Sequence, residues 1–380
     1  MLVRELRTLG FRNLSGGAVA LSEGITLVWG ENGAGKTNLL EALYIGLAGR
    51  SPRTRSERET IGFGEPLARV EVEVSERSAP RLVREAGKVR PRTFLFAISR
   101  DGERRHLVDG AAAGPEHAEL RPPIAVFMPD RLILVKGPPA ARRAHLDRFW
   151  AALWPARAEV RRRYARALAQ RNALLGRIRA GDGDRGSLDA WDRELAAVGV
   201  ELMEVRGRAA ERARGPFATA ATELGLPGEA KLGYRPRSTA ADPQRLAAEL
   251  AERREADIAR GFTTHGPHLD ELALVLDGRS ARRYASQGQQ RAVLLALLFA
   301  EREVLVSEGR PPPLMLLDDV ASELDPGRRR LLCERLRHGG GQAVITATEP
   351  SQLPAGCSAA ELAVRAGRVI GEASDSSAAA

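Results

Sequence analysis

The first quarter of the chain alternates apolar and polar positions as β-strands do. Residues 2–6 and 70–74 alternate apolar with charged side chains, and residues 25–29 form a short apolar run. A period of two predicts strands with one buried face, whereas an apolar run predicts a strand buried on both faces. Residues 38–48 instead carry leucines at helical spacing, and Gly49 follows as a C-cap candidate. We therefore expect an α/β start.

The middle of the chain is predicted to be helical. Apolar residues recur every three or four positions over 160–178 and again, in a heptad pattern, over 188–209. The glycine-rich stretch 181–186 separates them, so the two helices should form an antiparallel hairpin. This hairpin either packs on a core as an ordinary two-helix face or projects as a short coiled coil.

Strand signals return in the last third of the chain. Apolar runs at 272–276, 314–317 and 342–346 predict strands, and residues 288–300 predict a long apolar helix. The order α/β, helical, α/β is most simply a helical element inserted into one split, sheet-containing domain. The expected divisions are 1–135, 136–258 and 259–366, followed by a disordered tail at 367–380.

Composition changes this picture little. The 380 residues include 58 Lys plus Arg against 49 Asp plus Glu, a net charge of +9. Such a balance permits an anionic partner such as nucleic acid, although nearly all the basic residues are arginines, which a GC-rich genome also produces. No apolar run is long enough to cross a membrane and no secretory signal is visible, so we expect a cytoplasmic protein without a membrane partner. The two cysteines, Cys333 and Cys357, are too few for a disulfide framework and lack metal-ligand spacing.

A glycine-rich segment between the second predicted strand and the first helix fits a phosphate-binding loop. Its residues are Gly30, Glu31, Asn32, Gly33, Ala34, Gly35, Lys36 and Thr37. Glycines let backbone N–H groups converge on phosphate oxygens, and the start of the helix adds its dipole. Lys36 is predicted to reach the β- and γ-phosphates of ATP, and the Thr37 hydroxyl to coordinate Mg²⁺.

Two acids follow the apolar run 314–317 and suggest the partner of this loop. Asp318 is predicted to hold the Mg²⁺ and Asp319 to polarise the attacking water as a general base. Taken alone, a pair of acids after a strand is explained better by a turn or a helix N-cap. The phosphate-binding loop far upstream favours the catalytic interpretation, with Lys36, Asp318 and Asp319 as catalytic residues.

A third motif opens the long helix upstream of the acids. Ser286, Gly288 and Gln289 stand in the segment Ser-Gln-Gly-Gln-Gln-Arg, which resembles the signature loop of ABC-type ATPases. A serine hydroxyl, a glycine amide and a helix N-terminus together form an anion site. In that class the signature loop covers the γ-phosphate bound by a second copy, although Ser286 can also be a simple N-cap.

Further segments narrow this resemblance. Arg12 and Asn13 lie in an opening, Leu-Gly-Phe-Arg-Asn-Leu, that resembles the ABC heads of DNA-repair and chromosome proteins, and both are assigned to nucleotide binding by that resemblance. Residues 30–42, 127–130, 136–139, 264–268 and 286–291 resemble the corresponding segments of the RecF family of bacterial recombination mediators, in the same order. The similar blocks run from residue 9 to about residue 325.

The resemblance implies a fold and a function. The fold is an α/β, P-loop ABC-type ATPase head, a mixed sheet with flanking helices split in sequence, with an inserted all-helical arm domain. The function is an ATP-dependent homodimer that clamps DNA at single-strand/double-strand junctions and releases it on slow, DNA-stimulated hydrolysis. RecR and RecO are the implied protein partners in gap repair, recombinase loading, replication restart and SOS induction.

The sequence also departs from the ABC pattern. No glutamine precedes Gln170, so the usual Q-loop glutamine is absent and Asp130 is the nearest candidate. No histidine follows residues 342–346, which leaves Thr346 or Thr348 for the switch position. These departures argue against an alternative function, the ATPase subunit of a membrane transporter. The other alternative is a short structural-maintenance-type ATPase. That class needs a longer coiled coil than residues 157–215 can provide.

DNA contact by this chain has weaker support. Arg142, Arg143, Arg161, Arg162 and Arg163, with Arg166 and Arg171, place many guanidinium groups on the predicted helices. Such groups bind phosphates without reading sequence, but an arginine-rich solvated face is an equally good explanation. Aromatic residues make up only 4% of the chain, so backbone contacts to duplex are favoured over base stacking.

Overall fold

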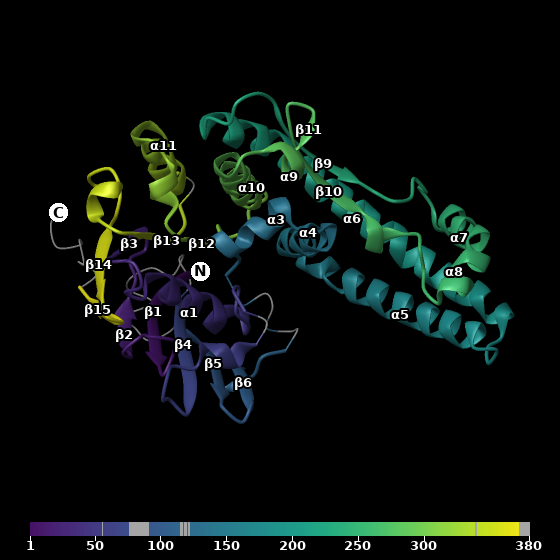
Figure 1. The fold of residues 1–380 in the computed structure, drawn as a ribbon, viewed down its shortest axis with the longest axis horizontal. Coiled ribbons are helices and arrows are strands. Elements are labelled where there is room, and N and C mark those ends of the chain that lie inside the picture. Colours follow the sequence, from purple (N-terminus) through teal and green to yellow (C-terminus); the bar gives the residue numbers. More distant parts are fainter. Residues whose placement is uncertain are drawn as a thin grey trace. The chain divides into compact units, whose positions relative to one another are not determined.

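The computed structural model describes residues 1–54, 56–75, 91–114, 117, 120, 122–338 and 340–371. The chain forms two compact units, one of residues 1–131 with 305–380 and the other of residues 132–304 (Figure 1). The first unit thus comes from both ends of the chain, as expected for a split domain. The predicted divisions at 135/136 and 258/259 differ from these limits, and the second falls inside the compact unit 132–304.

An antiparallel sheet of six strands lies in the first unit, in the order β2-β1-β4-β5-β6-β7. Its strands are β1 (Leu2–Leu9), β2 (Gly17–Ala20), β4 (Leu67–Ser75), β5 (Arg92–Ser99), β6 (Arg104–Val108) and β7 (Ala111–Ala112). The alternation that predicted β4 appears in its burial, because Val70, Val72 and Val74 are buried while the charged residues between them are more exposed.

The second sheet of this unit is mostly parallel, in the order β15-β14-β3-β13-β12-β8. Its strands are β3 (Ile25–Trp29), β8 (Ile124–Phe127), β12 (Leu314–Leu317), β13 (Ala343–Ala347), β14 (Ala360–Arg365) and β15 (Arg368–Ile370). The apolar runs are the central strands, as expected for strands covered on both faces. β13 lies between β3 and β12 and runs parallel to both, so all three carboxyl ends meet at one edge.

Helix α1 (Lys36–Ala48) contacts strands of both sheets. Ten of its residues, Glu41 among them, are buried, and Gly49 ends it in the left-handed conformation, as predicted. The side chain of Gln342 also joins the two sheets. Its Nε2 donates to the carbonyls of Val3 and Ser22, both at 2.7 Å, and its Oε1 accepts from the amide of Val3 at 2.8 Å.

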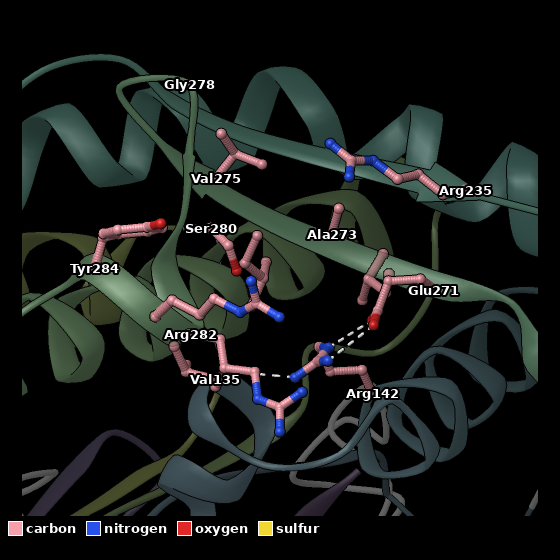
Figure 2. A pocket seen from close by; sticks show the side chains of 13 residues that line it. Val135, Arg142, Arg235, Glu271, Ala273, Val275, Gly278, Ser280, Arg282 and Tyr284 are labelled. Atoms are coloured by element: carbon pink, nitrogen blue, oxygen red, sulfur yellow. Dashed lines mark hydrogen bonds and ion pairs between the residues drawn. The ribbon is translucent and has the colours of Figure 1, made fainter.

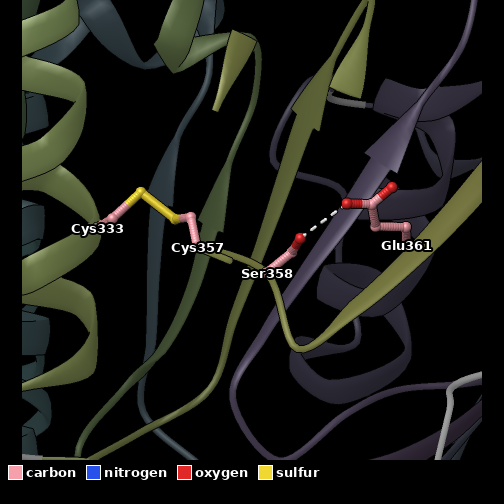
Figure 3. The surroundings of a disulfide bond; sticks show 4 residues. All are labelled: Cys333, Cys357, Ser358 and Glu361. Carbon is pink, nitrogen blue, oxygen red and sulfur yellow. Dashed lines mark hydrogen bonds between the residues drawn. A yellow bond between two sulfur atoms is a disulfide. The ribbon is translucent and has the colours of Figure 1, made fainter. Parts of the chain in front are cut away.

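Helix α11 (Pro326–Arg337) is linked covalently to the segment before β14. Cys333 and Cys357, 24 residues apart, form a disulfide bond (Figure 3). Their spacing along the chain did not indicate this pairing, because the two residues are brought together only by the fold. The expected tail also needs correction, since Arg368–Ile370 pair with β14; residues 372–380 lie outside the described residues.

The second unit is largely helical. Its helices are α3 (Ile133–Lys136), α4 (Pro139–Leu153), α5 (Glu159–Arg179), α6 (Leu188–Glu223), α7 (Pro243–Glu252), α8 (Arg254–Arg260), α9 (Ala281–Tyr284) and, up to Val304, α10 (Gln287–Ser307). α5 and α6 are the predicted hairpin. Because α6 also packs against α7 and a three-stranded sheet, the hairpin is part of a core and is not a free coiled coil.

That three-stranded sheet has the order β11-β10-β9, with β9 (Ala230–Arg235), β10 (Glu271–Leu276) and β11 (Arg279–Ser280). All its pairings are antiparallel, and Glu271 is the register partner of Arg235. Leu272, Leu274 and Leu276 are buried, whereas the alternate residues of β10 are only partly buried. One face of this sheet therefore remains accessible.

Candidate functional site

The predicted phosphate-binding loop joins β3 to α1 and has the expected strand–loop–helix form. Gly30 has φ +153° and a Cβ there would come within 2.2 Å of the carbonyl oxygen of Val364, so no side chain fits. Gly35 has φ +117° and stands immediately before the first helical residue. The loop is thus shaped by backbone conformations and close approaches that favour glycine.

Lys36 is folded back over this loop. Its Nζ donates to the carbonyl oxygens of Gly30 at 2.7 Å and Glu31 at 2.9 Å, and the residue is only 8% exposed. Burial lowers the pKa of Lys36 from its ordinary value, and the negative charges of Asp319 and Asp318 partly offset that effect. The ammonium group therefore lies at the loop without a carboxylate in hydrogen-bond contact among the described residues.

Asp318 follows β12 and lies opposite Thr37. The Thr37 hydroxyl is 3.0 Å from both carboxylate oxygens of Asp318, although 281 positions separate the two residues. The hydroxyl of Thr346, near the end of β13, donates a second hydrogen bond to Asp318 at 2.7 Å. Burial raises the pKa of Asp318 above its ordinary value, against the lowering effect of these two hydrogen bonds.

Asp319 is placed by its backbone. Its φ is +49°, and its amide donates to the Thr346 hydroxyl at 2.8 Å. The parallel order β3-β13-β12 explains the arrangement, because it brings the ends of all three strands to one edge. Of the two threonines proposed for the switch position, Thr346 therefore touches the acid pair. The amide of Thr348 instead donates to Gln352.

The oxygen donors at this edge fit Mg²⁺. A magnesium ion takes oxygen ligands and is commonly held by one or two carboxylates together with phosphates and water. Thr37 and Asp318 supply a hydroxyl and a carboxylate side by side. No group of three or more His, Cys, Asp or Glu side chains that could hold a metal occurs among the described residues, so phosphate oxygens would have to complete the coordination.

Arg12 and Asn13 lie against the same loop. Asn13 donates to the carbonyl of Gly33 at 3.0 Å and accepts from Asn38 at 2.8 Å. Arg12 makes a bidentate ion pair with Glu41, with both N···O distances 3.0 Å. Asn13 thus contacts the loop directly, whereas Arg12 is held by an acid on α1.

Glu41 was not recognised in the sequence as part of this site. It is 0% exposed and receives hydrogen bonds from Arg12, from Arg53 at 3.0 Å and from Ser51 at 2.6 Å. The positive charge of Arg53 also lowers the pKa of Asp318, so Arg53 belongs to the electrostatic surroundings of the site. The available signal was a lone acid in the otherwise apolar helix 38–48, which requires a buried basic partner.

The signature residues lie in the other compact unit. Ser286 Oγ accepts from the amide of Gln289 at 3.2 Å, and Gln289 Oε1 accepts from the amide of Ser286 at 2.8 Å. This is a capping box at the start of α10. Gly288 has open space where a Cβ would stand. The capping explanation of Ser286 is therefore confirmed, and its role toward a nucleotide stays a prediction.

The helical arginines do not form one free basic face. Arg142 pairs with Glu271, and Arg171 is 0% exposed between Asp192 and Asp257. Arg162, Arg163 and Arg166 pair with glutamates on α5 and α6. Acids at nearby positions of the fold thus bind most of these guanidinium groups, and their contact with DNA stays a prediction.

His268 and Asp130 belong to the segments 264–268 and 127–130 that resemble the RecF family. His268 accepts or donates at both ring nitrogens, toward Tyr164 at 2.8 Å and the carbonyl of Thr263 at 3.0 Å, and burial lowers its pKa. Both ring nitrogens of His268 are thus engaged by residues of the helical unit itself. The side chain of Asp130, the candidate for the Q-loop position, lies outside the described part of the structure.

Comparisons with known proteins agree with these features. Residues 2–367 match the model of the RecF/RecN/SMC N terminal domain. The DNA replication and repair protein RecF of Deinococcus radiodurans is 38% identical over 350 residues, which cover 90% of this chain and 89% of that protein. RecF of Anaeromyxobacter sp. (strain Fw109-5) is 39% identical over 360 residues, 92% of this chain and 93% of that one.

Solved structures show the same relation. The recombination mediator protein RecF with ATP, of the RecFOR pathway, superposes with a TM-score of 0.81 at 25% identity over 98% of this chain and 97% of that one. An SMC head bound to the C-terminal winged-helix domain of ScpA superposes with a TM-score of 0.59 at 15% identity, over 99% of this chain and 98% of that one. At this identity the similarity shows a shared fold alone. The fold is that of an SMC-type ABC ATPase head, and the chain belongs to the RecF family.

Proposed function

We propose that this chain is an ATP-dependent DNA-binding protein of recombinational repair. It binds ATP and Mg²⁺, pairs with a second copy, holds DNA at single-strand/double-strand junctions and releases it after slow hydrolysis that DNA stimulates. The observation that carries the proposal is the meeting of Thr37 and Asp318, 281 residues apart in sequence, beside the loop that holds Lys36. The ATP in a solved RecF structure supports it.

The residues at the site have distinct roles. The amides of Gly33 to Thr37 bind the phosphates, and Lys36 leaves its two carbonyl partners to bind the β- and γ-phosphates. Thr37 and Asp318 would hold Mg²⁺, which when bound neutralises charge developing on the phosphates. Asp319 takes a proton from the attacking water, and Thr346 fixes the backbone of Asp319 and one oxygen of Asp318.

The second half of the site comes from another copy of the chain. Ser286, Gly288 and Gln289 are exposed or partly exposed at the N-terminus of the 21-residue helix α10, where an anion is favoured. A γ-phosphate would be bound by the Ser286 hydroxyl and the Gly288 amide. ATP then joins two molecules, and its hydrolysis separates them.

The wider role follows the family. RecR and RecO are the proposed partners, and the complex acts in the cytoplasm in gap repair, recombinase loading, replication restart and SOS induction. Family membership favours this role over a transporter subunit or a structural-maintenance-type ATPase. No helix among the described residues has both the length and the apolar character needed to cross a membrane.

Sedimentation with and without ATP tests the pairing of two copies. Wild type is expected to form a dimer with ATP, whereas Ser286→Arg stays monomeric because the guanidinium fills the phosphate position. Thr222→Arg adds the same charge to an exposed position of α6 and should dimerise normally. If Ser286→Arg also dimerises and hydrolyses ATP like wild type, the proposed pairing fails.

DNA affinity tests the second part of the proposal. Gapped and blunt duplexes should be compared with ATP, with ADP and without nucleotide, each over a range of salt concentrations. The ATP form should bind gapped DNA most tightly, and log affinity should fall linearly with log salt. Equal affinity in all three nucleotide states would contradict a nucleotide-controlled clamp.

A further inference from the structure

The accessible face of the three-stranded sheet in the unit 132–304 contains a pocket of about 320 Å³. Ala273 and Val275 of β10 line it and are partly buried, whereas Leu272 and Leu274, the alternate residues of the strand, are buried. Figure 2 shows Tyr284 and Arg235 at opposite ends of the pocket, with Ala273 and Val275 between them. The pocket lies wholly within one compact unit.

The positive charge of this pocket is not neutralised. Its one acid, Glu271, is already bound by the buried Arg142 through two hydrogen bonds of 2.7 and 2.9 Å. Three more arginines line the pocket and are exposed: Arg235, Arg282 and Arg283. The Nε–H group of Arg282 donates a hydrogen bond to the carbonyl of Lys136. None of these three arginines has an ion pair among the described residues.

This arrangement differs from the other arginine clusters of the same unit. Arg171 and Arg206 each face two carboxylates, and Arg162 and Arg166 share Glu159. Like charges gathered without acids repel one another, and an anion removes that repulsion. Guanidinium groups bind phosphate oxygens in bidentate geometry, so phosphate is the anion they fit best.

Tyr284 adds a second recognition element. The ring is 65% exposed, and the guanidinium of Arg279 lies 5.8 Å from its centroid. An exposed aromatic ring beside unpaired arginines is the combination that single-stranded nucleic acid uses, with the base on the ring and the phosphate on the cations. A pocket of this volume accepts one nucleotide and is too small for a base-paired duplex.

We propose that this pocket binds one unpaired nucleotide of a DNA strand. The phosphate contacts Arg235, Arg282 and Arg283, and the base stacks on Tyr284. The shared chemistry is a nucleotide phosphate, and the exposure of all four side chains favours a strand that continues past the pocket over a free nucleotide. The inference rests on the proposed DNA binding and adds to it the place where a single strand lies next to the signature segment at Ser286.

The main test uses Arg235→Gln with Arg283→Gln, because neither side chain has a hydrogen bond or ion pair to lose among the described residues. Binding of a short fluorescent oligodeoxythymidine to the full chain is measured against salt. Loss of two phosphate contacts should reduce the salt slope by about 1.4, since each contact on single strands contributes about 0.7. The matched control, Arg177→Gln with Arg179→Gln, removes two exposed arginines of α5 that also lack ion pairs among the described residues, and should keep the slope.

Two further variants separate stacking and space from charge. Tyr284→Ala should weaken oligonucleotide binding about 5- to 100-fold by loss of one stacked base. Ala273→Leu fills part of the pocket without changing charge and should also weaken binding. If both variants bind the strand like wild type, or if the α5 control loses as much slope as the pocket variant, the inference is overturned.

Competing ligands and controls complete the experiment. The assignment to an unpaired nucleotide would be overturned if free thymidine monophosphate bound the pocket as tightly as the strand does. It would also be overturned if all pocket variants lost affinity for a blunt duplex as much as for the single strand. ATP-dependent dimerisation, measured by sedimentation, should be unchanged in the pocket variants. Wild-type protein that binds no DNA at all would instead refute the proposed function itself.

Discussion

The two compact units both bury charged side chains, but they treat them differently. In the helical unit Arg171 lies between Asp192 and Asp257, and Arg206 lies between Asp147 and Asp270. At the phosphate-binding loop, within the part of the chain that the structure describes, the Lys36 ammonium is bound by carbonyl oxygens alone and the Asp318 carboxylate by two hydroxyl groups. Paired charges hold the helices together, whereas incompletely compensated ones leave room for a charged ligand.

The pKa shifts express the same difference. Burial lowers the pKa of Lys36 and raises the pKa of Asp318, so each charged form is disfavoured where it lies. The pKa of Arg206 is instead raised, because Asp147 and Asp270 outweigh the effect of burial. A cation and an anion that are both under-compensated at one edge of a sheet are what a bound nucleotide with its metal ion would correct.

The largest expected effect comes from Asp319→Asn. Loss of a general base should lower ATP turnover about 10²- to 10⁴-fold while nucleotide binding remains. Lys36→Met, in contrast, should abolish nucleotide binding together with turnover. Asparagine tolerates the positive φ of residue 319, so the backbone should not change. Phosphate release and binding of a fluorescent ATP analogue are the measurements.

Asp109→Asn is the matched control for that substitution. Asp109 has a similar φ of +51° and lies in the first unit, at the start of the β6–β7 turn. Its substitution removes a charge from the same backbone conformation and should leave turnover unchanged. Hydrolysis at the wild-type rate in Asp319→Asn would assign the base to another residue.

Arg171→Met tests the paired side of the comparison. It leaves Asp192 and Asp257 buried without their cation, which should cost about 3–5 kcal/mol of unfolding free energy. Arg161→Met, at an exposed position of the same helix, should change stability by less than about 0.5 kcal/mol. Denaturant unfolding measures both. A small effect of Arg171→Met would mean that its ion pairs do not hold the helices.

Thr346→Val removes the hydroxyl that connects the two acids. The amide of Asp319 then has no acceptor, and we expect a loss of about 1–3 kcal/mol in stability together with slower turnover. Thr346→Ser keeps the hydroxyl and should restore both. Thr348→Val is the control, since the Thr348 hydroxyl makes no hydrogen bond among the described residues. Equal turnover in the valine and serine variants would exclude a positioning role.

The smallest expected change in stability comes from Asp318→Asn and is a gain. Asp318→Asn should abolish turnover, and it should stabilise the protein by about 0.5–2 kcal/mol at neutral pH, as removal of a functional charge often does. Because the folded-state pKa of Asp318 lies above its ordinary value of 3.8, the native state binds this proton more tightly, and stability falls as pH rises through that range. Thermal unfolding from acidic to neutral pH should lose this contribution in the variant. Destabilisation at neutral pH would refute it.

Local patterns were sufficient to predict most elements of the fold. The strands at 25–29 and 314–317, the helix after the glycine-rich loop and the hairpin around 181–186 are confirmed. Each depends on periodicity or on turn residues that act over a few positions. The proximity of Thr37 and Asp318 could be inferred only because two motifs of one chemistry stood in the expected order.

Contacts between distant residues could not be predicted in the same way. Glu41, the disulfide between Cys333 and Cys357 and the ion pairs of Arg142 and Arg171 all depend on which elements become neighbours. Counting arginines along the predicted helices therefore could not show which of them are bound by acids of the fold. Arg235 and Arg283, which have no ion pair among the described residues, became distinguishable only when the positions of the acids were known.

Gln342 sets a restriction on what sequence this architecture tolerates. From its place just before β13, its amide supplies one acceptor and one donor to Val3 in β1 and a second donor to Ser22, a combination that no other side chain of that length provides. A glutamate of equal size would turn an oxygen toward two carbonyl oxygens and would force either protonation or separation of the layers. The alignment of the two sheets thus depends on the difference between an NH₂ group and an oxygen atom at a single position.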